Sequence, residues 1–150
     1  YDESLAQYRK TLDLEPNRPG AFAGIAAVYQ QKGMYDEAIK FYEKAISGTG
    51  RAPNALVVLA YAYATSGRKA EATKIANELA AIGKQQYVSP FDLAILYTGL
   101  GEKERAIEQL NKAFEDRAGW IMYLKVEPLF DPLRSDPGFT DLVRRLNLPQ

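Results

Sequence analysis

The densest group of side chains able to do chemistry is EPLFDPLRSDPGFTDLVRRL, residues 127–146. It holds four carboxylates, three arginines and three prolines. Carboxylates can serve acid–base catalysis, and arginines can bind anions. The candidate anion-binding residue is Arg134, with Asp131 and Asp136 on either side. The alternative is that these charges fix a turn and stabilise helix ends, and it is the interpretation we favour, since charges beside helix termini usually serve those termini.

Elsewhere the sequence offers no set of residues that assembles a catalytic or metal site. It contains no cysteine and no histidine, which excludes thiolate nucleophiles, imidazole bases and Cys/His zinc sites. The serines have no G-x-S-x-G turn, and the stretch SGTGR at 47–51 lacks the Gly-Lys-Ser/Thr ending of a phosphate-binding loop. We therefore predict no enzyme activity, no catalytic or metal-binding residues, and no cofactor.

The charge balance limits the classes of partner. Lys+Arg and Asp+Glu both number 19, so the net charge is zero. This argues against a large electrostatic footprint on nucleic acid or on an anionic membrane. No apolar run approaches the ~20 residues that span a bilayer. We expect no nucleic-acid partner and no membrane partner; the compartment stays open, with the cytoplasm favoured.

The elements that must position any site repeat along the chain with a period of 34 residues. Three columns of identical residues show this spacing: Tyr29, Tyr63 and Tyr97; Gly33, Gly67 and Gly101; and Ala38, Ala72 and Ala106. Such a period indicates a stack of identical structural units. Each unit contains two stretches with apolar residues at i, i+3, i+4 and i+7, which predicts two amphipathic helices. The glycine between them suits a helix end, where a left-handed backbone is needed.

This pattern resembles the tetratricopeptide repeat (TPR) family, over residues 1 to about 116. The resemblance implies an all-α fold, a right-handed α-solenoid of helix hairpins closed by a C-terminal helical cap. We take residues 1–150 as a single domain. Residues 1–17 are then the second helix of a truncated repeat, 19–52, 53–86 and 87–118 are three repeats, and 119–150 are the cap. Gly50 and Lys84 stand where the family often has proline, so these two junctions are expected to be less regular.

The resemblance also implies that the first helix of each hairpin lines a concave groove that binds partner segments. The implied groove residues are Ala23, Ala27, Gln30, Asn54, Val57, Tyr61, Phe91 and Ile95. The lysine, asparagine and arginine set with which one subclass clamps a terminal carboxylate is absent, so recognition of acidic tails is not predicted. The alternative for Val57, Tyr61, Phe91 and Ile95 is that they pack between neighbouring repeats, as helical apolar stripes usually do.

The two ends of the chain carry separate expectations. Residues 1 to about 14 form a helix with Leu5, Tyr8 and Leu12 on one face, so we expect more structure before Tyr1 and possible self-association through this helix. After residue 118 the repeat columns end. A short helix near 120–125, a turn or 3₁₀ piece near 129–134 and a helix from Pro137 suit a cap, because the last hairpin needs a cover. This tail resembles that of bacterial multidomain TPR proteins.

The sequence therefore predicts a protein–protein interaction module that binds an apolar peptide, helix or neighbouring domain in the concave groove. The alternative is a structural or oligomerisation domain of a larger bacterial enzyme or regulator. The partner, the activity of the host protein and the oligomeric state do not follow from the sequence.

Overall fold

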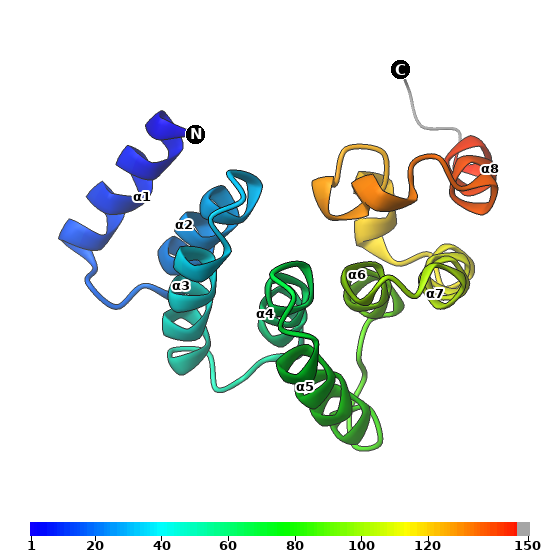
Figure 1. Cartoon of the computed structure of the whole chain (residues 1–150), viewed down its shortest axis with the longest axis horizontal. Helices are drawn as coiled ribbons and strands as arrows, with labels where there is room; N and C mark the ends of the chain where they lie inside the picture. Colours follow the sequence, from blue (N-terminus) through cyan, green and yellow to red (C-terminus); the bar gives the residue numbers. More distant parts are fainter. Residues whose placement is uncertain (147–150) are drawn as a thin grey trace.

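The computed structural model describes residues 1–146, and its regular structure is helical, with no strand in that range. The all-α solenoid expected from the sequence is confirmed (Figure 1). In chain order the elements are α1 (Asp2–Leu14), α2 (Pro19–Gln31), α3 (Tyr35–Ser47), α4 (Pro53–Thr65), α5 (Lys69–Ile82), α6 (Pro90–Leu100), α7 (Lys103–Glu115), the 3₁₀ helices η1 (Gly119–Tyr123) and η2 (Pro128–Leu133), and α8 (Pro137–Arg145).

Three hairpins, α2–α3, α4–α5 and α6–α7, turn at the glycines of the repeat. Gly33, Gly67 and Gly101 have φ values of 73°, 85° and 78°, a left-handed backbone that costs glycine little. The N–H of the residue after each glycine donates to the carbonyl of the repeat tyrosine, over 2.9, 2.8 and 2.9 Å. These bonds satisfy carbonyls that the helix end leaves unpaired. The glycine and tyrosine columns of the sequence thus meet in one recurring turn.

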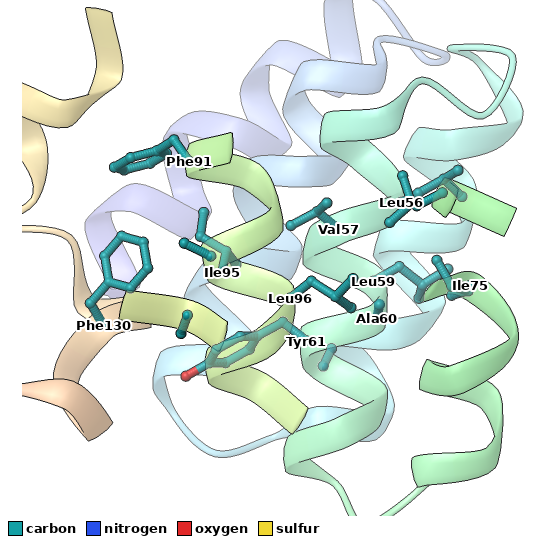
Figure 2. Close-up of a cluster of buried hydrophobic side chains, with 14 of the residues drawn as sticks. Leu56, Val57, Leu59, Ala60, Tyr61, Ile75, Phe91, Ile95, Leu96 and Phe130 are labelled. Atoms are coloured by element: carbon teal, nitrogen blue, oxygen red, sulfur yellow. The ribbon is translucent and has the colours of Figure 1, made fainter. Parts of the chain in front are cut away.

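Alanines of the repeat let the helices cross closely. Ala26, Ala60 and Ala94 in the first helices are fully buried, and so are Ala38, Ala72 and Ala106 in the second helices. Helix α4 packs against α3, α5 and α6, and is apolar around most of its circumference. Figure 2 shows its Leu56, Leu59 and Ala60 in a cluster with side chains of the neighbouring helices. The core is therefore continuous from one repeat to the next.

The third repeat departs from the others at its start. Proline begins the first helix of each repeat, at Pro19, Pro53 and Pro90. The first two prolines are 34 residues apart, but Pro90 comes 37 residues after Pro53 while the tyrosines keep their spacing. Residues 87–89 are irregular instead of helical. Helix α6 consequently lacks most of the first turn that α2 and α4 possess.

The cap begins with η1 and η2 and ends with α8. Phe130, Leu133, Phe139 and Leu142 are buried in the same core as the repeats. Asp136 caps α8 by accepting hydrogen bonds from the N–H groups of Gly138 and Phe139, at 2.8 and 3.4 Å, and Pro137 follows at the first helical position. Residues 147–150 of the expected cap lie outside the described residues.

The N-terminal helix α1 packs on α2. Leu5 is buried with Ile25 and Val28. The ring of Tyr8 covers Gly24 so closely that a Cβ there would clash with it. Leu14 is the large apolar side chain that this helix exposes. Within residues 1–146, no helix combines the length and the apolar character needed to cross a membrane.

Candidate functional site

The solenoid curves so that η1 and η2 lie on the inner side of the arc, beside α6, while α5 lies on its outer side (Figure 1). The inner face between α2 and α4 is hollowed at two places. We call these the apolar hollow and the polar hollow. They lie next to each other along α2, since Ala27 lines the first and Gln30 lines the second, less than one helical turn further on.

The apolar hollow has a volume of about 350 Å³. Small or apolar side chains from α2, α3 and α4 make most of its wall: Pro19, Gly20, Ala23, Ala27, Tyr42, Ala45, Thr49, Asn54, Ala55 and Val58. Ala23, Ala27 and Val58 are half-buried, so a partner can reach them. Removing these surfaces from water on binding would contribute roughly 25 cal/mol per Å² of apolar area.

The polar hollow has a volume of about 430 Å³. Helices α2 and α4, the start of α3, the residue before α1 and the cap segment η2 supply its wall: Tyr1, Gln30, Gln31, Tyr35, Tyr61, Pro128, Leu129, Asp131 and Pro132. Gln30 is buried, and among the described residues its Oε1 has no hydrogen-bond partner. This end of the groove therefore offers aromatic rings, an acceptor and a carboxylate in one place.

The structure separates the eight implied groove residues into three groups. Ala23, Ala27 and Asn54 line the apolar hollow, and Gln30 and Tyr61 line the polar hollow. Val57, Phe91 and Ile95 line neither hollow and are buried in the core. These three residues pack between neighbouring elements, as the alternative interpretation of the sequence expects.

The cap covers the inner face of the third repeat. Phe130 of η2 is fully buried, and its ring meets that of Phe91 edge-on, with centroids 5.3 Å apart. Figure 2 shows Phe130 beside Phe91 and Ile95 of α6. The open part of the groove is thus the part formed by the first two repeats. The sequence predicted a cover for the last hairpin, but it gave no sign that Pro128, Leu129, Asp131 and Pro132 also form a wall of the groove.

Carboxylates surround the aromatic side chains of the groove. The pKa of Tyr61 is raised to about 12, chiefly by burial and further by the neighbouring Tyr35, Asp131 and Glu127. Burial also raises the pKa of the Tyr42 hydroxyl, and Glu127 adds to that increase. Both tyrosines are therefore neutral at physiological pH, and their surroundings disfavour any additional negative charge.

Arg134 is occupied by the cap itself. Its Nε donates to Oδ1 of Asp131 over 2.6 Å, and its Nη1 and Nη2 donate to the carbonyls of Lys125 and Glu127 over 2.7 and 3.3 Å. The guanidinium thus ties together the turn between η1 and η2. A pair between Arg134 and Asp136, the other expected partner, is not among these contacts.

A larger hollow, of about 530 Å³, lies between α3 and α5. Its polar groups are largely satisfied within the chain: Arg51 donates to both carboxylate oxygens of Glu78, over 2.7 and 2.6 Å, and the Tyr63 hydroxyl donates to Glu43 over 2.8 Å. Because an unpaired buried group points more strongly to a missing ligand than volume does, the inner groove is the better candidate. Over residues 1–146, no cluster of three or more potential metal ligands is present.

Comparison with known protein families identifies two of the three hairpins. Models of the tetratricopeptide repeat match residues 19–47 and 91–115, which are the α2–α3 hairpin and most of α6–α7. No curated protein matches the chain. The hairpin α4–α5 lies between the two matches and has the same glycine turn and the same buried alanines. Two repeats matched by sequence, with a third hairpin of the same construction between them, show that this chain contains tetratricopeptide repeats.

Proposed function

We propose that this chain is a protein-interaction module that binds an apolar peptide, a helix or a neighbouring domain in the groove between α2 and α4. Tetratricopeptide repeats generally bind protein partners. The observation that carries the proposal is the apolar hollow, where Ala23, Ala27 and Val58 leave a half-exposed apolar surface between two rigid helices. Concave sites lined mainly by apolar side chains with a few polar groups are typical binding sites.

A peptide-selection experiment tests this proposal. A phage-displayed library of random linear peptides is selected on the folded protein and counter-selected on the variant Ala23→Glu, which places a charge in the apolar hollow. Ala70→Glu is the matched control, because Ala70 is exposed on α5 and lies outside the groove. We expect enriched peptides to bind the parent and Ala70→Glu equally, and Ala23→Glu at least tenfold more weakly. Equal binding to all three proteins would refute the groove as the site.

One observation favours the second candidate, a structural or oligomerisation domain of a larger bacterial enzyme or regulator. Trp120, Met122, Tyr123 and Val126, on η1 and the turn after it, are large apolar side chains that remain exposed, Trp120 by 64%. The rings of Trp120 and Tyr123 lie 5.6 Å apart and form one surface. Clustered apolar side chains of this kind commonly mark an association surface.

Light scattering over a range of protein concentrations separates the two candidates. A self-associating domain should show a rising mass that Trp120→Ser abolishes. Leu14→Ser tests the N-terminal helix in the same way, because Leu14 is its exposed apolar side chain. A constant monomer mass for the parent protein at all concentrations would refute self-association and favour the first candidate, the interaction module.

A further inference from the structure

Gln30 is the buried polar side chain of the groove that its own chain leaves unpaired. The residue is 7% exposed, and its Oε1 has no hydrogen-bond partner within residues 1–146. Most buried polar atoms have a hydrogen-bond partner, and an exception calls for an explanation such as a ligand that is bound in use. Gln30 lines the polar hollow, but its Oε1 is enclosed, so the side-chain amide has to turn toward the hollow to meet a group that enters it.

The other walls of the polar hollow suit a positively charged group. Tyr35 and Tyr61 offer aromatic rings, whose faces attract cations. Asp131 offers a carboxylate, of which the Arg134 pair uses Oδ1. Among the described residues that line this hollow, none has a positively charged side chain. An anionic group would therefore meet a carboxylate and an unpaired acceptor with no basic side chain to compensate it.

The electrostatic surroundings agree with this choice. Asp131 and Glu127 both raise the pKa of Tyr61, in addition to the larger effect of burial. The contribution of these two carboxylates to the shift reflects a negative field, which favours a positive guest, whereas the contribution of burial disfavours a charge of either sign. The apolar hollow next to the polar one suits the uncharged part of a bound peptide segment.

We propose that the polar hollow holds the lysine or arginine side chain of a bound peptide segment, with Gln30 Oε1 accepting a hydrogen bond from its charged head and the tyrosine rings packing against it. This inference rests on the proposed function and narrows its partner class to segments that place a basic residue beside small apolar ones. The cap segment η2 is then part of the binding site as well as the cover of the last hairpin, since Asp131 comes from it.

Peptides selected on the parent protein test the inference by their composition and by their response to Gln30→Met. Methionine keeps the length and removes the acceptor. We expect lysine or arginine at one fixed position of the enriched peptides, and a tenfold to hundredfold weaker affinity for Gln30→Met, as befits a hydrogen bond to a charged group. Gln109→Met is the matched control on α7, outside the groove, and should bind like the parent.

A second measurement uses a small probe, so that no library is needed. Nuclear magnetic resonance titration with N-acetyl-lysine N-methylamide should shift the side-chain amide signals of Gln30 in the parent. The uncharged norleucine analogue should leave those signals in place. Asp131→Asn should lower the affinity for the lysine probe, because asparagine keeps the shape of the side chain but removes its negative charge.

The possible failures are distinguishable. Enriched peptides without a basic residue, or equal affinities for parent and Gln30→Met, overturn the cation site and leave the interaction module standing. Absence of any enriched peptide contradicts the proposed function itself. Equal shifts from the lysine and norleucine probes overturn the charge preference directly, because they show that Gln30 responds to any occupant of the hollow.

Discussion

Gly99 lies where α6 crosses α4, and its lack of a side chain allows that crossing. A Cβ at this position would stand 2.8 Å from Cδ2 and 3.0 Å from Cα of Tyr61. The Tyr61 backbone cannot move without shifting α4, so the clash has to be relieved by separating the two helices. The tyrosine that lines the polar hollow is therefore held in place by a glycine of the next repeat.

The variant Gly99→Ala should lower the free energy of unfolding by ~1–3 kcal/mol, as overpacking of a core does, despite the better helix propensity of alanine. Chemical denaturation measures this change. Gly20→Ala is the control, because nothing lies within 4 Å of a Cβ there. We expect this control to be neutral or more stable by up to ~1 kcal/mol. Equal stability of Gly99→Ala and the parent would contradict the close crossing.

Asp92, in the first turn of α6, should make stability depend on pH. Burial raises its pKa above the ordinary value of 3.8, so the folded state binds the proton more tightly than the unfolded state. The favourable contribution is complete below the unfolded pKa and is lost as the pH rises through the folded pKa. At about pH 7, the ionised carboxylate therefore destabilises the fold.

Thermal unfolding of Asp92→Asn tests this direction. The melting temperature should rise relative to the parent at about pH 7, and the difference should vanish at about pH 3, where both side chains are neutral. Glu104→Gln, in the exposed first turn of α7, should show no such gain. A gain for Asp92→Asn that persists at low pH would show that burial of the charge is not its cause.

The sequence predicted some of the residues that line the two hollows and missed others for a definable reason. The family resemblance implied Ala23, Ala27, Gln30, Asn54 and Tyr61, which line the hollows, and helical register fixes which face of a helix such residues occupy. Register says nothing of what approaches that face from elsewhere in the chain. Asp131 reaches the groove through the path of the cap, which depends on the packing of Phe130 against Phe91, and no local pattern encodes that contact.

At the scale of single elements, α8 and α6 begin in chemically different ways although each has proline at its first position. Asp136 accepts hydrogen bonds from the N–H groups of Gly138 and Phe139. Ser89 occupies the same place before α6 but makes no side-chain cap hydrogen bond. The repeated prolines fix the first backbone angle of both helices, while only α8 gains a side-chain acceptor for its free N–H groups.

Asp136→Ala should cost ~1 kcal/mol of stability, since it leaves N–H groups of α8 without their acceptor. Ser89→Ala, the matched control, should cost much less. Denaturant titration of both variants against the parent measures the difference. Similar losses for the two would mean that the capping hydrogen bonds contribute little beyond the conformation that proline imposes.

Element positions followed well from the sequence wherever turn chemistry was explicit. The glycine columns marked the left-handed turns, and Asp136 with Pro137 marked the start of α8. The late start of α6 at Pro90 was not specified beyond an irregular junction. The tyrosine spacing would start this helix three residues before Pro90, but the helix begins at Pro90, because proline suits the first helical position and disfavours helix in the residue before it.

At the scale of the whole molecule, stability should be distributed along the solenoid. Each repeat packs on its neighbours, and Phe130 joins the cap to the third repeat. In such arrays the stability of one unit depends on its own interfaces more than on distant ones. Loss of the cap contact should therefore loosen the C-terminal half first.

Phe130→Ala should cost ~3–5 kcal/mol, and hydrogen exchange should show where the loss falls. We expect faster exchange in α6 and α7, with little change in α2 and α3. Phe22→Ala, in α2 at the other end of the solenoid, should have the opposite effect: faster exchange in α2 and α3, with little change in α6 and α7. Uniformly faster exchange in all helices of the Phe130 variant would show instead that the solenoid unfolds as one cooperative unit.

The polar hollow joins parts of the chain that are far apart in sequence, since Gln30 and Asp131 face the same space. A solenoid in which each repeat contacts only its neighbours can change its curvature, because small rotations between successive repeats add up along its length. A partner side chain bound between α2 and η2 would link the two ends of the arc and fix its curvature. The mechanical stiffness of this protein should therefore depend on whether its groove is filled, and the distance between its two ends would report the presence of a partner.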